Sequence, residues 1–319
     1  MRVVWLTEFG GPEVLVPGTA PEPAPGPGQV VVEVAHANLT FVETQFRAGR
    51  APWPFTGSLP LVPGNGVGGT IVTAGPGVDP AIVGRRVVST TGGTGGYAEL
   101  VAVDANLPVD VPAGLALDDA VALLADGRTA LMLVAAAGLR VGERVLVEAA
   151  AGGVGTLLVQ LARAAGCRVV ALAGGDRKVR LARTLGAEFA LDYRVPGWAD
   201  QVRAATGGVD VVFDGVGGRL ARTAFDLLNP GGRLVSFGLA GGTWADVSEA
   251  EAAARQVTLL RPSAPPERLR DWTGQALALG AAGRLRPVIG QRFPLAEAAD
   301  AHAAMQSRAT VGKTLLDVR

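Results

Sequence analysis

One stretch of the chain, residues 145–166, limits the possible folds more than any other. It opens with an apolar run, Val145–Val147, that is too short for anything but a buried strand. Glycines then cluster at Gly152, Gly153 and Gly155, and the residues that follow have apolar side chains spaced for one face of a helix. A strand, a glycine turn and a helix in this order are the setting in which a glycine motif predicts a phosphate site.

The turn itself reads AAGGVG over residues 150–155, with Ala150 in the first glycine place. We expect Gly152 to let backbone N–H groups approach a pyrophosphate, and Gly155 to let the helix pack closely on the strand. The N-terminus of that helix supplies free N–H donors and the positive end of its dipole. For the motif taken alone, an ordinary tight strand-to-helix turn is the alternative.

The pattern around this turn favours the phosphate site. Candidate strands occur at residues 145–148, 168–173, 189–191, 209–213, 233–237 and 257–260, and candidate helices occur between them at 156–165, 177–185, 198–205, 219–228 and 249–255. Strands that alternate with helices predict right-handed βαβ units and a parallel sheet covered on both faces. The fold class is therefore α/β, with a doubly wound dinucleotide-binding domain.

The first part of the chain, up to about residue 119, has a different texture. Glycine and proline turns separate short β-branched runs at residues 3–6, 29–37, 69–73, 86–89 and 98–103, with one short helix at 41–49. This pattern predicts a compact β-barrel-like domain. A helix at 118–137 follows, and after residue 260 come a helix at 266–279, a strand at 288–293, a helix at 295–307 and a strand at 313–318. This tail is too short to be a domain, so we expect residues 1–119 and 262–319 to form one domain and residues 120–261 the other.

Composition and charge exclude several classes of protein. Lys+Arg 29 balances Asp+Glu 29, so no global field favours nucleic acid or an anionic membrane. We expect no membrane span, because no apolar run approaches the roughly 20 residues that span a bilayer, and we expect no secretion signal at the N-terminus. The single cysteine, Cys167, cannot form a disulfide or a thiolate zinc cluster within one chain and is expected in the core. We expect a cytoplasmic protein whose partner is a small molecule.

Motifs spread over the whole chain resemble the medium-chain dehydrogenase/reductase superfamily, and specifically its zinc-free quinone oxidoreductase branch. The matching segments are Glu8–Leu15, Glu43–Gly49, Pro63-Gly64, Gly96–Glu99, Gly127–Ala130, Ala149–Gly155, Asp214–Gly218, Arg233–Gly238 and Ser307–Lys313. The resemblance implies a GroES-like β-barrel domain, built from both ends of the chain, together with a Rossmann domain. It also implies a homodimer formed through the last Rossmann strand, and residues 257–260 are apolar enough for that edge.

The resemblance also bears on metal binding. In the places where zinc-dependent members have Cys, His and Cys, this chain has Thr40, Asn65 and Asp126, which do not make a zinc site. The two histidines are His36 and His302. We expect a surface or satisfied structural role for His302, and for His36 a structural role with the active cleft as the alternative. No catalytic zinc is expected.

The residues after the second Rossmann strand bear on cofactor choice. NAD-selective domains place an acidic residue at the tip of that strand, but here the tip is Gly174 and Gly175, followed by Asp176 and then two cations. This arrangement suits a 2′-phosphate. The alternative is that Asp176 caps the next helix and the cations are solvated. The family's NADPH-binding members use a Gly, a Lys and a Tyr that correspond to Gly174, Lys178 and Tyr193, so the resemblance implies NADPH.

The resemblance implies further cofactor contacts along the chain. Val216 and Phe237 would line the cleft, with plain packing as the alternative for each. The full set expected to bind the cofactor is Thr129, Ala151, Gly152, Gly153, Val154, Gly155, Gly174, Lys178, Tyr193, Val216, Phe237, Gly238 and Lys313.

The candidate catalytic residues are Thr40, Asn65 and Asp126, a polar set expected to face the nicotinamide. Asp126 is the ionisable member and hence a candidate acid, with a cap or turn next to Gly127 as the alternative. Gln45 and Ala51 replace tyrosines that are common in the family, so the usual phenol donor is missing. Trp53 and Phe55 are expected to form a lid, a substrate wall or a loop packed on its own domain.

The resemblance implies hydride transfer from NADPH to a quinone or to an α,β-unsaturated carbonyl. Two alternatives stay open at this point. One is an NADPH-binding protein with a sensing or structural role, and the other is an enoyl reductase dedicated to one pathway.

Overall fold

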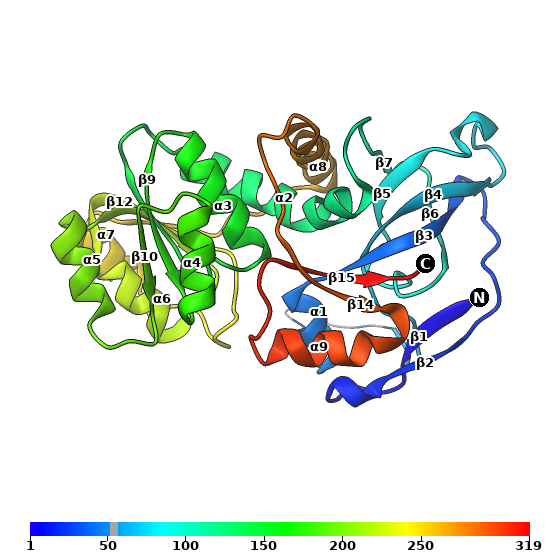
Figure 1. Cartoon of the computed structure of the whole chain (residues 1–319), viewed down its shortest axis with the longest axis horizontal. Helices are drawn as coiled ribbons and strands as arrows, with labels where there is room; N and C mark the ends of the chain where they lie inside the picture. Colours follow the sequence, from blue (N-terminus) through cyan, green and yellow to red (C-terminus); the bar gives the residue numbers. More distant parts are fainter. Residues whose placement is uncertain (52–56) are drawn as a thin grey trace. The chain divides into compact units, whose positions relative to one another are not determined.

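The structure is a computed structural model that describes residues 1–51 and 57–319. These residues form two compact units, which we name the barrel unit (Met1–Gly127 with Thr273–Arg319) and the sheet unit (Arg128–Trp272). In Figure 1 the blue N-terminal and red C-terminal segments both belong to the barrel unit. The sequence predicted domain limits near residues 120 and 261. Those domain limits stay a prediction, and the units named here are defined by the compactness of the structure.

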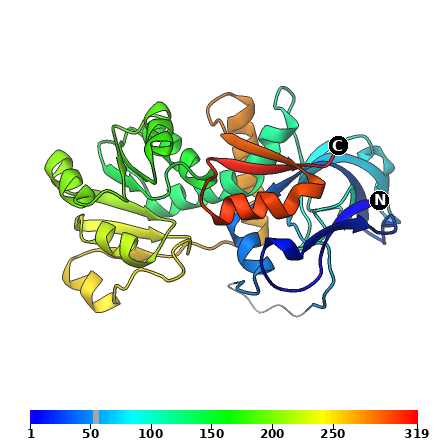
Figure 2. The ribbon, with the colours of Figure 1, turned by 60° about the horizontal axis from the view of Figure 1, so that its bottom comes forward.

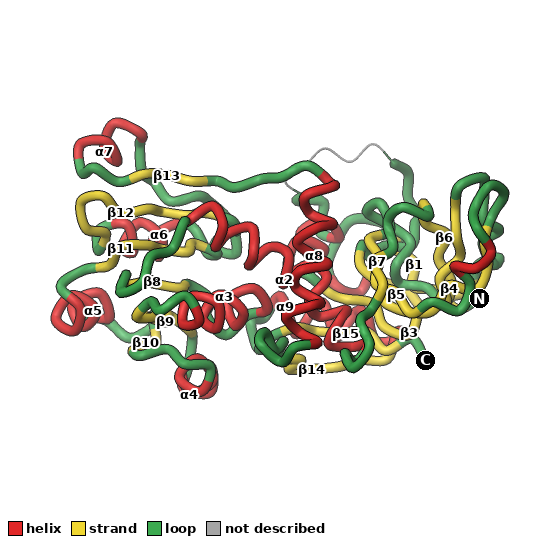
Figure 3. Tube along the Cα trace, turned by 90° about the horizontal axis from the view of Figure 1, so that it is seen from above, coloured by secondary structure: helices red, strands yellow, loops and turns green. Residues whose placement is uncertain are grey.

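The sheet unit is built on one parallel sheet of six strands, in the order β10-β9-β8-β11-β12-β13. Seen in Figure 3, the strands follow one another in this order. Their bounds are β8 (Arg144–Val147), β9 (Arg168–Ala173), β10 (Phe189–Asp192), β11 (Val209–Asp214), β12 (Leu228–Ser236) and β13 (Thr258–Leu260). The strand order reverses between β8 and β11, as in a doubly wound dinucleotide fold, and this confirms the predicted fold class.

Helices connect these strands: α3 (Gly153–Ala164), α4 (Asp176–Thr184), α5 (Trp198–Thr206), α6 (Gly218–Phe225) and α7 (Glu249–Ala254). Because parallel crossovers are right-handed, the reversal of strand order places α3 and α4 on one face of the sheet and α6 and α7 on the other. The core between the layers includes Leu146, Val212 and Phe225, all fully buried.

The structure differs from the prediction at the boundary between α6 and β12. The strand expected at 233–237 begins at Leu228, and the helix before it ends at Phe225 rather than at 228. Leu228 pairs with Val209, and the register between β11 and β12 shifts before the regular ladder resumes at Arg233. The Asn-Pro-Gly-Gly run over residues 229–232 hides this early pairing, because it reads as a turn.

The barrel unit contains a sheet in the order β14-β15-β3-β4-β5-β7, with β6 also paired to β3, and a separate pair of β1 and β2. Their bounds are β1 (Arg2–Leu6), β2 (Leu15–Thr19), β3 (Gln29–Leu39), β4 (Gly66–Ala74), β5 (Arg86–Thr90), β6 (Leu100–Asp104), β7 (Val109–Asp110), β14 (Ile289–Pro294) and β15 (Lys313–Asp317). The barrel unit also contains the helices α1 (Phe41–Arg47) and α9 (Ala298–Gln306). In Figure 2 the red and orange C-terminal segments lie beside the blue ones, and β15 pairs with β3.

Two strands of this unit, β2 and β7, were not predicted. β2 contains Pro17 and Gly18, which are typical of turns, and β7 is a pair of residues held by β5. Such short strands depend on a partner strand more than on their own sequence.

The helix α2 (Leu117–Ala137) carries the chain from one unit into the other. It has 21 residues and is apolar enough to span a membrane by length and composition alone. It is not an uninterrupted apolar run, since it contains Asp118, Asp119, Asp126 and Arg128. Within the fold, 56% of its most apolar window is buried, as in a core helix, and Gly127 packs closely against Ala276 of α8 (Pro266–Ala281).

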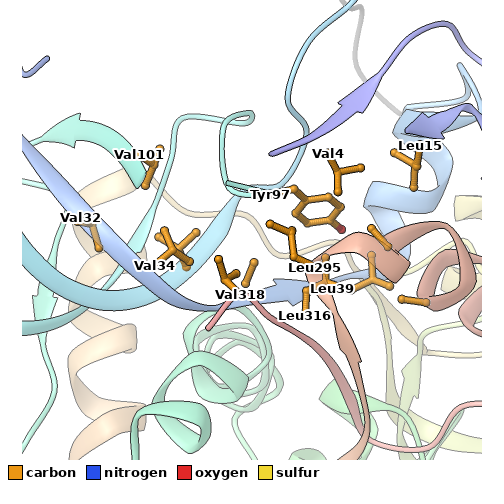
Figure 4. Packing of buried hydrophobic residues seen from close by; sticks show 14 of the residues in the cluster. Val4, Leu15, Val32, Val34, Leu39, Tyr97, Val101, Leu295, Leu316 and Val318 are labelled. Atoms are coloured by element: carbon orange, nitrogen blue, oxygen red, sulfur yellow. The ribbon is translucent and has the colours of Figure 1, made fainter. Parts of the chain in front are cut away.

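Tyr97 lies at the centre of the barrel core. Figure 4 shows its ring among Val4, Leu39 and Leu295, which are all buried. Its hydroxyl is 2.9 Å from Nε2 of His302, whose ring is 1% exposed. His302 is therefore an interior residue, and the surface location considered from the sequence is wrong. Burial, and then the charge of Arg47, lowers the pKa of His302 to about 3.

The buried imidazole predicts acid lability of the barrel unit. The folded-state pKa lies below the ordinary value of 6.5, so stability is present above pH 6.5 and is lost as the pH falls toward 3. By about pH 4 the loss reaches on the order of 3 kcal/mol. Urea unfolding of wild type and of His302→Gln at neutral and acid pH measures this loss. The free energy of unfolding is expected to fall less in the variant than in wild type as the pH is lowered. Equal acid dependence of both proteins would contradict this assignment.

Candidate functional site

The glycine turn joins β8 to the N-terminus of α3. Gly152 is the N-cap residue and the helix begins at Gly153, three residues earlier than the sequence pattern indicated. The first helical hydrogen bond runs from the Thr156 N–H to the Gly152 carbonyl, at 2.9 Å. The N–H groups of Gly153, Val154 and Gly155 therefore have no acceptor within the helix. This is the arrangement that binds a phosphate group.

Close packing explains the last glycine of the turn. A Cβ atom on Gly155 would lie 2.2 Å from the carbonyl oxygen of Ala149. Any side chain there would push α3 away from the end of β8, so Gly155 has the role predicted for it.

The tip of β9 brings together two of the residues predicted to choose the cofactor. A Cβ atom on Gly174 would lie 2.9 Å from the Tyr193 hydroxyl, so the phenol lies directly against the strand tip. Lys178 lies in the first turn of α4. The N-cap of that helix is Gly175, with φ of 93°, and Asp176 is its first residue. The alternative in which Asp176 caps the helix is therefore wrong.

The carboxylate of Asp192, next to the tip of β9, already has hydrogen-bond partners. It accepts hydrogen bonds from the Gly175 N–H at 3.0 Å and from the Arg194 guanidinium at 2.7 Å. The hydrogen bond from Arg194 lowers the pKa of Asp192 to about 2. A carboxylate that is ion-paired in this way is a poor partner for a ribose hydroxyl.

At the carboxyl ends of β11 and β12 the structure brings together Val216, Phe237 and Gly238. The Phe237 N–H donates to the Asp214 carbonyl at 2.9 Å, and the Phe237 ring lies against Gly215. A Cβ atom on Gly238 would lie 2.5 Å from the Gly215 carbonyl oxygen. These residues form the edge of the sheet on the β11 side of the glycine turn. Thr129, another expected contact, lies within α2.

In the barrel unit, Glu43 links two of the predicted catalytic residues. Its Oε2 accepts the Thr40 N–H at 2.6 Å and the Thr40 hydroxyl at 2.9 Å, and its Oε1 accepts the Asn65 N–H at 2.9 Å. The pKa of Glu43 is raised above its ordinary value, because the effect of burial exceeds the opposing effects of these hydrogen bonds and of the charge of Lys313. Glu43 is a residue of this site for which the sequence predicted no role. The signal was present, because Thr40 and Glu43 have the spacing of a capping box at the start of α1.

The third predicted residue, Asp126, forms a buried ion pair. Its Oδ1 lies 3.1 Å from Nζ of Lys313, and the two side chains are 11% and 3% exposed. Asp126 lies inside α2. The alternative in which it caps or turns the chain beside Gly127 is therefore wrong, and Lys313, expected along the cofactor, is paired with it.

The side-chain amide of Asn65 accepts hydrogen bonds through its Oδ1. Its Oδ1 accepts the Gly93 N–H at 2.8 Å and the Thr91 N–H at 3.3 Å. This fixes the direction of the amide and leaves the Nδ2 group as a donor. The Thr40 hydroxyl, by contrast, gives its proton to Glu43. Among the three predicted residues, Asn65 is the one that can donate a hydrogen bond to a substrate.

The remaining candidates are placed as follows. His36 Nδ1 lies 2.8 Å from Asp317 Oδ1, on the barrel sheet. Within residues 1–51 and 57–319, no three His, Cys, Asp or Glu side chains are grouped so that they could hold a metal ion. Trp53 and Phe55, the expected lid or wall, lie outside the described residues.

Comparisons with known proteins agree with this geometry. The family model described as "Alcohol dehydrogenase GroES-like domain" matches residues 26–113, and the one described as "Zinc-binding dehydrogenase" matches residues 153–275. The chain is 35% identical to a quinone oxidoreductase of Pseudomonas aeruginosa, over 98% of both chains. It is 33% identical to a 2-haloacrylate reductase of a Burkholderia species, over 96% of both. The crystal structure of Escherichia coli quinone oxidoreductase complexed with NADPH matches with a TM-score of 0.91 and 29% identity, over 99% of this chain and 100% of that one.

The contact at Gly155 gives a direct test of the turn. Gly155→Ala is expected to lower the free energy of unfolding by about 1–3 kcal/mol, because the new methyl group overlaps the Ala149 carbonyl. Gly274→Ala in α8 is the control, since a Cβ there meets no atom within 4 Å. The control is expected to be neutral or stabilising by up to about 1 kcal/mol. If Gly155→Ala has the same free energy of unfolding in urea as wild type, the close contact between Gly155 and Ala149 is contradicted.

Proposed function

The chain belongs to the medium-chain dehydrogenase/reductase superfamily, in its quinone oxidoreductase branch, and we propose that it transfers a hydride from NADPH to a quinone or an α,β-unsaturated carbonyl without a catalytic zinc. One observation carries the proposal. Gly174, Tyr193 and the first turn of α4 lie together at the tip of β9, next to the glycine turn. The carboxylate of Asp192 beside them is ion-paired with Arg194.

NADPH fits the residues of the sheet unit. The N–H groups of Gly153, Val154 and Gly155 would hold its pyrophosphate, and the adenosine would lie beside Gly174 and Tyr193. Lys178, in the first turn of α4, would bind the 2′-phosphate. The NADPH complex of the Escherichia coli relative supports this choice of cofactor.

When bound, NADPH supplies a hydride to an electron-poor acceptor. The residues of this chain bind and orient the reactants. We propose that the Nδ2 group of Asn65 donates a hydrogen bond to the acceptor's carbonyl oxygen, which becomes more negative as hydride arrives. Glu43 fixes Thr40 and the backbone of Asn65 by its hydrogen bonds. Asp126 is ion-paired, so its proposed role is to hold Lys313 in place rather than to give up a proton.

The donor set supports the zinc-free mechanism. The Thr40 hydroxyl is bound to Glu43, the Asn65 oxygen accepts two backbone N–H groups, and Asp126 is neutralised by the ammonium of Lys313. A cation at these positions would have to displace Lys313 and would find neither a thiolate nor an imidazole among the three residues.

Two relatives support the choice of acceptor. The Pseudomonas aeruginosa protein is a quinone oxidoreductase and the Burkholderia protein a 2-haloacrylate reductase. A quinone and an activated alkene have in common a carbon that accepts hydride and a conjugated carbonyl group whose oxygen gains charge. One donor such as Asn65 Nδ2 would serve both.

We also propose a cytoplasmic homodimer. β13 is an edge strand of the sheet unit, so its outer edge can pair with a second copy. Cys167 is a buried free thiol, which suits a reducing compartment. A mass corresponding to one chain in sedimentation at micromolar concentration would overturn the dimer.

The function is tested by a panel of simple quinones and enones with NADPH and NADH side by side. We expect oxidation of NADPH by at least one acceptor class, a kcat/KM at least about tenfold higher with NADPH than with NADH, and no loss of rate after dialysis against a chelator. Equal rates with both cofactors, or loss of activity on chelation that zinc restores, would contradict the proposal.

The role of Asn65 is tested by Asn65→Asp. Aspartate keeps the oxygen that accepts from Thr91 and Gly93 but lacks the N–H donor. We expect kcat to fall about 10- to 100-fold, while the Kd for NADPH in a fluorescence titration stays within about twofold. His36→Asn, on the barrel sheet, is the control and should leave kcat unchanged. An Asn65→Asp enzyme with wild-type kcat would rule out the carbonyl contact.

A further inference from the structure

Two carboxyl groups lie side by side in the interior of the sheet unit. Val147 of β8 pairs with Phe213 of β11, so Glu148 and Asp214 are the next residues on the two neighbouring strands. The Glu148 N–H donates to the Phe213 carbonyl at 3.1 Å, which extends the parallel ladder to this position. Residues at matched positions of a parallel pair have side chains on the same face. Both side chains are 0% exposed.

The groups around this pair treat the two carboxyls differently. Asp214 accepts three hydrogen bonds, from the Val216 N–H at 3.1 Å, the Gly217 N–H at 2.7 Å and the Ser236 hydroxyl at 2.8 Å. Glu148 accepts one long hydrogen bond at its Oε2, from the Val216 N–H at 3.3 Å. Its Oε1 is buried and has no hydrogen-bond partner among the described residues. Asp214 is thus held as an acceptor, and Glu148 is not.

A proton on Glu148 resolves this imbalance. Two carboxyl groups can hydrogen-bond to each other when one of them carries a proton, and two adjacent buried negative charges are strongly disfavoured. Burial, then the charge of Asp214 and a side-chain hydrogen bond with it, raises the pKa of Glu148 well above its usual range. Geometry and charge therefore agree on which of the two carboxyls is protonated.

The place of the pair in the sheet connects it to the dinucleotide. The glycine turn that would hold the pyrophosphate begins directly after Glu148, and the tip of β9 would take the adenosine. The other half of the dinucleotide must then extend to the opposite side of β8, over the carboxyl end of β11. That end is the segment 214–217, whose backbone N–H groups bind the carboxylate of Asp214.

We propose that Glu148 and Asp214 share one proton at neutral pH, and that this proton fixes segment 214–217 for the nicotinamide half of the cofactor. Glu148 is then a positioning residue, which acts through Asp214 and the Val216–Gly217 backbone. The inference rests on the proposed function for its cofactor, while the shared proton itself does not depend on any cofactor.

The first test needs the full-length protein without cofactor. Infrared difference spectroscopy between wild type and Glu148→Gln at neutral pH is expected to show the carbonyl stretch of a protonated carboxylic acid in the wild type and its loss in the variant. Absence of that signal at neutral pH overturns the proposal. The result does not depend on whether NADPH binds, so it separates failure of this inference from failure of the proposed function.

The second test measures the Kd for NADPH by fluorescence titration of Glu148→Gln and Glu148→Leu. Glutamine offers a neutral N–H donor to Asp214, as a protonated glutamate does, whereas leucine fills a similar volume without a donor. We expect the glutamine variant to bind within about twofold of wild type and the leucine variant about tenfold more weakly. Equal affinity of the two variants would mean that Glu148 acts by packing alone and would overturn its positioning role.

Discussion

The parallel pairing of β8 with β9 on one side and β11 on the other is the interaction on which the rest of the sheet unit depends. It puts the carboxyl ends of three strands at one edge, and it reverses the direction in which the chain winds. The glycine turn, the Gly174–Tyr193 contact and the Asp214 segment all lie just beyond those ends. Each is a local feature, and the strand order is what brings them to the edge of the sheet at which we propose that the dinucleotide binds.

The barrel unit depends in the same way on one carboxylate. Glu43 accepts N–H groups from Thr40 and from Asn65, which are 25 residues apart in the printed sequence, and thereby joins the start of α1 to the loop before β4. Lys313 contributes charge to Glu43 and an ion pair to Asp126. A buried carboxylate is costly unless it is hydrogen-bonded or paired, so these contacts are interdependent. The polar set is therefore a connected group rather than three separate side chains.

Much of the fold could be predicted because its signals are local. Short apolar runs bounded by glycine turns gave the six strands of the sheet unit, and the glycine turn was placed correctly between a strand and a helix. The start of α3 was predicted three residues late, because glycine is a poor helix former while a helix N-terminus tolerates it. The early start of β12 at Leu228 was hidden by a Pro-Gly run, since pairing with Val209 decides it and local propensity does not.

The site was harder to predict because its contacts are distant in sequence. Lys313 and Asp126 are 187 residues apart, and β15, which pairs with β3 and β14, carries the lysine into the barrel unit's polar set. Glu148 and Asp214 are brought together by the register of two neighbouring strands, and no local motif at either position predicts this contact. His302 illustrates the same limit, because a helical residue near the end of the chain gave no sign that its ring is buried against Tyr97.

A crystal structure with NADPH tests the central claim most directly. The account predicts the pyrophosphate on the N–H groups of Gly153, Val154 and Gly155, the 2′-phosphate at Lys178, and the nicotinamide ring beside Val216 and Phe237. A dinucleotide bound away from the α3 N-terminus, or a 2′-phosphate turned away from α4, would contradict it.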